Sequence, residues 1–203
     1  MSTGTWAVVL AAGSSHRFGG GKLTSTFRGR PLASHVATTF AEALASGILG
    51  GGVAVIPAGD TALAWMFDTA GLRLVENPGA ATGLAGSVQR GLAALAGEPA
   101  AGAALMVLAD QPLLRLEVVA RLVAEWRGGA AVVRPRYADD PAPGHPVLLA
   151  RALWPHASAL RGDQGFSSLL GGALGEVREV PVPGGNPDVD TPADLARLEA
   201  TGG

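Results

Sequence analysis

Five short stretches of the chain are almost continuously apolar and rich in β-branched residues. They are residues 6–12, 52–57, 72–77, 103–110 and 130–135. A strand covered on one face alternates apolar and polar residues, whereas a strand covered on both faces has no polar face to show. The pattern therefore predicts five strands in the middle layer of a layered structure.

Amphipathic segments separate these stretches. Apolar residues recur at three- and four-residue spacing in residues 32–47, 86–97 and 116–126, which predicts helices there. Alternating strands and helices fold most economically as a mainly parallel sheet with right-handed crossovers and helices on both faces. The sequence therefore predicts an α/β fold of three αβα layers, with ligands at the carboxyl ends of the strands.

The alternation loosens after residue 136, but nothing like a linker separates the later part. We expect residues 1–203 to form a single domain; a fused second domain is the alternative at this length. Charged residues make up 16% of the chain and its net charge is −2, so no polycationic surface exists to bind nucleic acid. The chain has no cysteine and no apolar stretch of membrane-spanning length. We expect no membrane partner and a cytoplasmic location.

A glycine-rich stretch, LAAGSSHRFGGGKL, follows the first predicted strand. Glycines 13, 19, 20 and 21 allow the backbone to turn tightly and point N–H groups at one anion. Arg17 and Lys22 add positive charge at the same place, which favours a polyphosphate ligand. The alternative is an exposed turn with incidental cations. The stretch matches neither a Walker A loop nor the G-x-G-x-x-G dinucleotide motif, so an NAD(P)-dependent oxidoreductase is disfavoured.

Carboxylates follow two later stretches. Asp110 lies at the end of the apolar run 103–110, and Asp188 and Asp190 lie in NPDVDTPADL. If Asp110 and Asp190 converge, they offer the oxygen ligands that Mg²⁺ prefers; both could also be ordinary turn residues, and we favour that interpretation for Asp188. Thr191 and Asp194 match a helix capping box.

Four motifs in this order, LAAGSSHRFGGGK, LADQP, GHPVLL and DVDTP, resemble the MobA-like nucleotidyltransferase family over residues 6–198. The segment 77–92 resembles the family's second nucleotide-contacting segment, whose Gly, Ser and further Gly fall on Gly83, Ser87 and Gly91. The resemblance implies a Rossmann-like nucleotide-diphospho-sugar transferase fold, GT-A-like, with a nucleotide-binding part at 6–112 and an acceptor-binding part at 113–198.

The implied reaction is the Mg²⁺-dependent transfer of a nucleoside monophosphate from CTP or GTP to the phosphate of molybdopterin, with release of pyrophosphate. Ala12 resembles the molybdenum cofactor cytidylyltransferase branch, which favours CTP. The resemblance implies catalytic roles for Arg17, Lys22 and Asp110, and metal binding by Asp110 and Asp190. It implies nucleotide binding by Leu10, Ala11, Ala12, Gly13, Ser14, Arg17, Lys22, Asn77, Gly83 and Ser87.

The acceptor side is less defined by the sequence. His145 in GHP is expected either to bind the pterin by hydrogen bonds or to have a purely structural role. Asp163 in GDQG is expected either in an acceptor-side loop or as a helix N-cap. Two other functions stay open: the same chemistry on another phosphorylated acceptor, such as a sugar phosphate or methylerythritol phosphate, and a non-catalytic carrier of the finished cofactor for a molybdenum hydroxylase.

Overall fold

A seven-stranded sheet forms the centre of the protein in the computed structural model, which describes residues 3–13, 15, 17–140, 144–170, 172 and 174–201. Its strands are β1 (Gly4–Leu10), β4 (Gly51–Pro57), β5 (Arg73–Asn77), β6 (Ala101–Leu108), β7 (Val132–Tyr137), β8 (Val147–Ala150) and β9 (Arg178–Val182), in the order β5-β4-β1-β6-β8-β7-β9. Within the described residues, β8 is antiparallel to both neighbours and the other pairs are parallel. The predicted mainly parallel sheet is confirmed.

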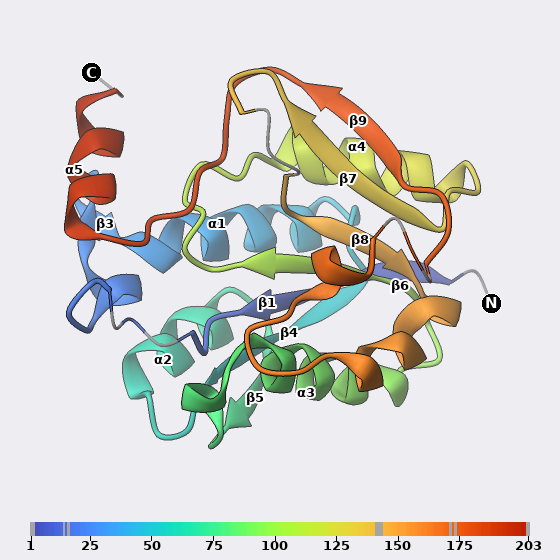
Figure 1. The fold of residues 1–203 in the computed structure, drawn as a ribbon, viewed down its shortest axis with the longest axis horizontal. Helices are drawn as coiled ribbons and strands as arrows, with labels where there is room; N and C mark the ends of the chain where they lie inside the picture. The colour runs from blue at the N-terminus through green and yellow to red at the C-terminus, as the bar shows by residue number, and fades with distance from the viewer. Residues whose placement is uncertain are drawn as a thin grey trace.

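Helices cover both faces of the sheet (Figure 1). The α-helices are α1 (Leu32–Ala45), α2 (Thr61–Thr69), α3 (Leu84–Ala96), α4 (Leu116–Arg127) and α5 (Pro192–Ala200), and the 3-10 helices are η1 (Lys22–Thr24), η2 (Ala80–Thr82), η3 (Arg151–Ala159) and η4 (Phe166–Leu169). A small hairpin joins β2 (Thr26–Phe27) to β3 (Arg30–Pro31). All five predicted strands and three predicted helices form, with shifted ends.

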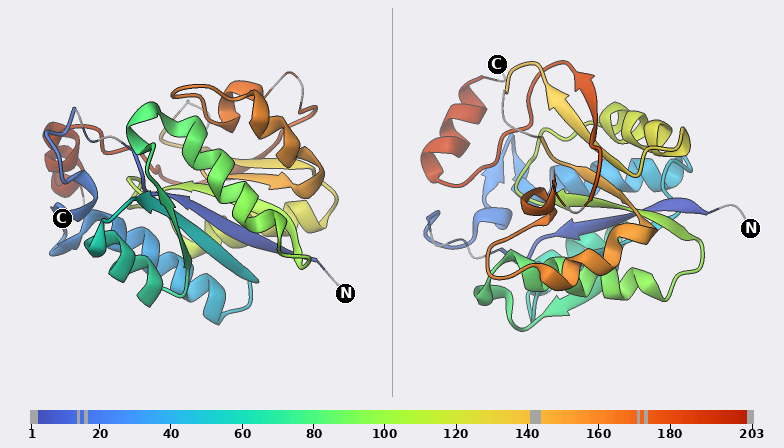
Figure 2. Two further views of the ribbon diagram at one scale, coloured as in Figure 1. Left: turned by 90° about the horizontal axis from the view of Figure 1, so that it is seen from below. Right: turned by 45° about the vertical axis from the view of Figure 1, so that its right-hand side comes forward.

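Two hydrophobic cores lie on opposite faces of the sheet. In β1, Ala7 and Val9 belong to the core that α1, α2 and α4 cover, while Val8 and Leu10 belong to the core beneath α3 and η3. Successive side chains of a strand point to opposite faces, so a strand between two cores must be apolar at every position. Figure 2 (left) shows α3 and η3 on one side of the sheet and α1 on the other.

The parallel strands bring their carboxyl ends to one edge of the sheet. β1, β4, β5 and β6 end at Leu10, Pro57, Asn77 and Leu108. The loops that follow these strands therefore meet at this edge, where open α/β sheets bind ligands.

The C-terminal segment returns to the same edge. After β9 the chain passes the end of β6, where Val189 N donates to Asp110 O at 3.1 Å. The predicted capping box then starts α5, since Thr191 accepts from the Asp194 amide and Asp194 accepts from the Thr191 amide. α5 lies beside the β2–β3 hairpin (Figure 1), where Arg28 N donates to Glu199 Oε1 at 3.3 Å.

No helix in the described part of the chain is long and apolar enough to cross a membrane.

Helix α3 approaches the sheet closely at one glycine, and this contact is testable. A Cβ added to Gly91 would lie 2.4 Å from Val8 Cγ1 and 3.2 Å from Val55 Cγ2. We expect Gly91→Ala to lower the free energy of unfolding by about 1 to 2 kcal/mol, because overpacking a core outweighs the gain in helix propensity. Chemical denaturation measures the change.

Gly86 of the same helix is the matched control, since its Cβ would approach Asn77 Nδ2 no closer than 3.8 Å. Gly86→Ala should leave stability unchanged or raise it by up to about 1 kcal/mol. Equal stability of Gly91→Ala and the parent protein would contradict the packing account.

Candidate functional site

A cleft of about 530 Å³ opens at the carboxyl ends of the parallel strands. This volume falls within the usual range for small-molecule sites. Its walls come from segments far apart in the sequence and are formed by Leu10, Ala12, Gly13, Arg17, Lys22, Leu23, Ala80, Gly83, Leu84, Ser87, Leu108, Asp110, Asp163, Asp188 and Asp190. Most residues that the sequence suggested for binding and catalysis thus line one cavity.

Two basic and two acidic side chains form a chain of ion pairs in this cleft. Lys22 Nζ lies 2.5 Å from Asp110 Oδ2 and 3.6 Å from Asp190 Oδ1. Arg17 Nη1 lies 3.1 Å from Asp190 Oδ2. The Lys22 and Asp110 side chains are 11% and 21% exposed, whereas the Arg17 side chain is 76% exposed. The sequence prediction that these four residues converge agrees with this geometry.

The glycine-rich loop positions Lys22 in a way that differs from the sequence expectation. Gly19, Gly20 and Gly21 all have positive φ angles, of 88°, 100° and 62°, which glycine adopts without strain. The amides of Gly19 and Gly20 donate to Ser15 O at 3.0 and 3.1 Å. These two amides close the turn, so the expectation that the glycine amides point at an anion is wrong for Gly19 and Gly20. The turn instead directs the chain into η1, which begins at Lys22.

A third carboxylate and two amides form a network that the sequence analysis did not assign. Gln111 Nε2 donates to Asp188 Oδ1 at 2.6 Å, and Asn186 Nδ2 donates to Gln111 Oε1 at 3.3 Å. Gln111 and Asn186 are buried. Asp188 is exposed overall, but its carboxylate contacts the Gln111 amide. Partial burial raises the pKa of Asp188, and the negative charge of Asp110 acts in the same direction. The interpretation of Asp188 as an ordinary turn residue is therefore wrong.

The second predicted nucleotide segment contributes the wall at the start of α3. Gly83 and Ser87 line the cleft, whereas Asn77 is buried beneath it and donates through Nδ2 to Ser87 Oγ at 2.9 Å. Asn77 thus positions Ser87. Gly91 packs against Val8 and lies outside the cleft lining.

A close backbone contact brings the GDQG loop to the same wall. Gly83 has a φ of +113°, and a Cβ there would lie 2.3 Å from the carbonyl of Gly162, so a side chain would push this loop away. Ala85 N also donates to Gly162 O at 2.9 Å. Asp163 consequently lines the cleft, and η4 starts after Gly165 without a side-chain cap, so Asp163 is not the N-cap.

Three other predicted site residues lie elsewhere or outside the described structure. Ala11 faces the core, and its amide extends the sheet by donating to Val55 O at 2.9 Å, so its side chain does not reach the cleft. Ser14 lies outside the described residues. His145 is half-buried outside the cleft lining, where burial lowers its pKa although the charge of Asp110 opposes this. Its carbonyl accepts from the Tyr137 hydroxyl at 3.0 Å, which fits the structural role.

The carboxylates fit a divalent cation whose remaining ligands come from a substrate and water. Within the described ranges, no group of three or more histidine, aspartate or glutamate side chains forms a ready-made metal site. Asp110 Oδ1, however, is buried without a hydrogen-bond partner among the described residues, and so it is an available oxygen ligand. Mg²⁺ typically takes one or two carboxylates together with waters and phosphate oxygens. Asp110 and Asp190 match that donor set.

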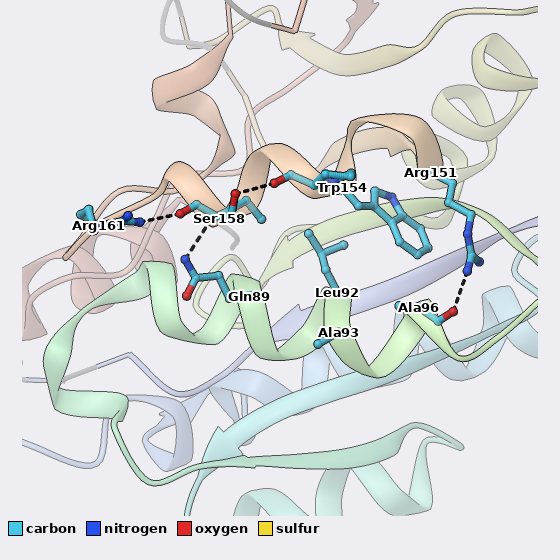
Figure 3. Close-up of a pocket in the computed structure, with 10 residues that line it drawn as sticks. Gln89, Leu92, Ala93, Ala96, Arg151, Trp154, Ser158 and Arg161 are labelled. Atoms are coloured by element: carbon cyan, nitrogen blue, oxygen red, sulfur yellow. Dashed lines mark hydrogen bonds between the residues drawn. The ribbon is translucent and has the colours of Figure 1, made fainter.

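A second groove of about 640 Å³ runs between α3 and η3, but its polar groups are already engaged (Figure 3). Gln89 donates to Ala157 O at 2.9 Å and Arg161 donates to Ser158 O at 2.6 Å. Arg151 donates to three backbone carbonyls, including Ala96 O at 2.6 Å, and stacks on Trp154. The Gln89 and Arg151 contacts hold η3 onto α3. The cleft at the strand ends therefore remains the candidate active site.

A family model described as the MobA-like NTP transferase domain matches residues 7–178. No curated protein is similar enough in sequence to count as a relative of the chain. The match contains Lys22, Asp110 and the start of α3, and it ends before Asp188.

Solved structures resemble the whole described fold. Rv0371c from Mycobacterium tuberculosis H37Rv is 28% identical, with a TM-score of 0.80 over 98% of this chain and 100% of that chain. A manganese complex of Rv0371c gives 25% identity and a TM-score of 0.76 over 98% and 100% of the two chains. CMP:2-keto-3-deoxy-manno-octonic acid synthetase, complexed with CTP, gives 15% identity and a TM-score of 0.75 over 98% of each chain.

The last likeness confirms the nucleotide-diphospho-sugar transferase type of fold. The family match covers most of the chain and supports a nucleotidyltransferase. The protein is thus a member of the MobA-like NTP transferase family.

Proposed function

We propose that the protein transfers CMP from CTP to the phosphate of molybdopterin and releases pyrophosphate. The observation that carries this proposal is the cluster of Arg17, Lys22, Asp110 and Asp190 in one cleft at the strand ends. In the reaction, an acceptor phosphate oxygen forms a bond to the α-phosphorus of CTP, and the bond between this phosphorus and the bridging oxygen of pyrophosphate breaks. The acceptor phosphate is already ionised near neutral pH, so no strong general base is required.

The cationic side chains supply electrostatic stabilisation. Negative charge builds up on the leaving pyrophosphate, and preorganised positive groups in a partly enclosed site stabilise such charge strongly. Lys22 projects from the floor of the cleft, and Arg17 from its exposed rim. We assign both to the triphosphate.

Asp110 and Asp190 are the residues that would hold a divalent cation, with Mg²⁺ as the proposed ion. When bound, such an ion supplies positive charge to phosphate oxygens and orients the substrate. The manganese complex of Rv0371c supports a divalent ion in a protein of this fold. Gln111 holds the carboxylate of Asp188, which lines the same cleft. This third carboxylate adds negative charge that attracts the ion.

The remaining walls are assigned to the nucleoside and the acceptor. Leu10, Ala12 and Gly13 after β1 and Gly83 and Ser87 at α3 form the proposed nucleoside wall. Asp163, on the loop locked against Gly83, is proposed to contact the acceptor. In this proposal the parts 6–112 and 113–198 form one catalytic domain, which acts in the cytoplasm and delivers its product to a molybdenum hydroxylase.

Pyrophosphate release with each of the four NTPs, with and without molybdopterin, tests the proposed reaction. We expect release with CTP only when molybdopterin is present, and weaker release with GTP. Release with CTP on a sugar phosphate or methylerythritol phosphate, but not on molybdopterin, would overturn the acceptor. No release with any NTP and any of these acceptors would contradict transferase activity and favour the carrier.

Asp110→Asn tests the acidic side of the site. Removing the charge while keeping the shape should lower kcat/KM by about 10² to 10³, the usual effect of losing one such electrostatic group. Circular dichroism and the thermal midpoint should show a folded protein. An unchanged kcat/KM would remove Asp110 from the site.

Lys22→Met tests the basic side, because methionine keeps most of the aliphatic stem and removes the ammonium. We expect kcat/KM for CTP to fall by about 10² or more. Arg127→Met removes one positive charge at the exposed end of α4 and is the matched control. Equal effects of the two substitutions would contradict a specific role for Lys22.

A further inference from the structure

The cluster of ion pairs raises a problem for any cation that binds there. The Lys22 ammonium lies 2.5 Å from Asp110 Oδ2, which is hydrogen-bonding distance, and is 3.6 Å from Asp190 Oδ1. Mg²⁺ lies about 2.0 to 2.1 Å from a carboxylate oxygen, so at Asp110 Oδ2 or Asp190 Oδ1 it would compete with the ammonium for the same lone pairs. Two positive charges would also repel each other at this separation. Asp110 Oδ1 stays available to a cation, but an ion held between Asp110 and Asp190 would share both carboxylates with the Lys22 ammonium.

The identity of residue 22 adds an independent observation. The chain contains 15 lysine and arginine residues, and Lys22 is the one lysine among them. Elsewhere the chain uses arginine for every lysine or arginine position, including Arg17 beside Asp190 and Arg134 beside Glu179. Arginine forms rigid two-pronged contacts with carboxylates, whereas lysine carries a compact charge on a flexible stem that makes and breaks contacts easily. Position 22 therefore has the basic side chain best suited to exchange between partners.

The local structure allows the side chain to move while the backbone stays in place. Leu23, the next residue, is buried in the core, and Ser25 N donates to Gly21 O at 3.0 Å, so η1 is anchored on both sides of Lys22. The Lys22 side chain enters the cleft from this anchor, and the cleft extends from Asp110 to the exposed Arg17. A rotation about the lysine stem can carry the ammonium away from Asp110 within one cavity.

We infer that Lys22 is an exchangeable counter-ion: it neutralises Asp110 in the free protein, leaves when a divalent cation binds there, and then contacts the nucleotide's phosphates. The inference rests on the proposed function and adds a coupling to it. A cation that binds alone displaces the Lys22 ammonium from Asp110 and leaves it without a new partner. When a triphosphate binds with the cation, the ammonium gains the phosphates as its new partner. Metal and nucleotide consequently bind cooperatively, and each binds weakly alone.

Mn²⁺ binding without nucleotide, followed by electron paramagnetic resonance, tests this exchange. Lys22→Met should bind Mn²⁺ more tightly than the parent protein, by about 5- to 150-fold, the usual range of coupling between two sites. Arg127→Met, the control for net charge, should bind Mn²⁺ as the parent does. Lys22→Arg should not bind more tightly, and adding Asp110→Asn to Lys22→Met should abolish the gain.

Unchanged or weaker Mn²⁺ binding by folded Lys22→Met would overturn the inference. A measurement on the unaltered sequence covers the case in which this variant misfolds. Protein labelled with ¹⁵N at lysine Nζ should give one side-chain ammonium signal, since Lys22 is the one lysine. The signal should shift as Mg²⁺ is added, and an unchanged signal at saturating Mg²⁺ would also overturn the inference.

These results are separable from the proposed reaction. Tighter Mn²⁺ binding by Lys22→Met, in a protein that releases no pyrophosphate from any NTP, would support the exchange and contradict the transferase proposal. Pyrophosphate release by the parent protein, with Mn²⁺ binding unaffected by Lys22→Met, would contradict the exchange and support the transferase.

Discussion

The contact between Lys22 and Asp110 joins two segments 88 residues apart and organises the candidate site. Both residues follow strands that are neighbours in the sheet, since β1 pairs with β6 along its whole length. Parallel pairing places the ends of these strands at one edge, and the opposite charges then draw the two loops together across it. Removing one partner of a partly buried ion pair leaves an uncompensated charge, which destabilises the protein. The intact pair therefore holds both loops in place.

The rest of the fold supports this edge through close packing. Small residues let elements approach where the site needs them, as Gly91 does against Val8 and Gly83 does against Gly162. The second contact fixes the loop that carries Asp163, and the capping box of α5 fixes the segment that carries Asp190. Residues of the cleft are thus held in place by backbone packing and helix capping as well as by the ion pairs.

Much of this arrangement could be predicted from the sequence because continuous apolar strands, amphipathic helices and helix caps are local signals. The pairing of β1 with β6, which the structure shows, places Asp110 near the glycine-rich loop. β9 escaped prediction because its sequence, REVPV, contains a proline and two charged residues, which an edge strand tolerates. Helix α2 also escaped prediction, because most of its positions are apolar and leave no clear polar face. Its start is marked mainly by Asp60, which caps the helix by accepting from Leu63 N at 3.0 Å.

The errors within the site have a common cause. The Gly19 and Gly20 amides were expected to bind an anion, but they are used by Ser15 O, and hydrogen bonding of a loop to itself leaves no periodic trace in a sequence. Asp188 was interpreted as an ordinary turn residue because its partner, Gln111, is 77 residues away in the sequence. The adjacency of Gln111 to Asp110 and of Asn186 to the DVD motif was the available signal, but one chain alone does not show which polar residues are paired.

The most direct test of the account is a double-mutant cycle on Lys22→Met and Asp110→Asn, measured by denaturant unfolding with EDTA and again with saturating Mg²⁺ and CTP. The account predicts a coupling free energy of about 1 to 3 kcal/mol between the two residues in EDTA, as for groups in direct contact, and its loss when the ligands are bound. Strictly additive effects in EDTA would show that the two side chains do not interact in the folded protein, and would contradict the account.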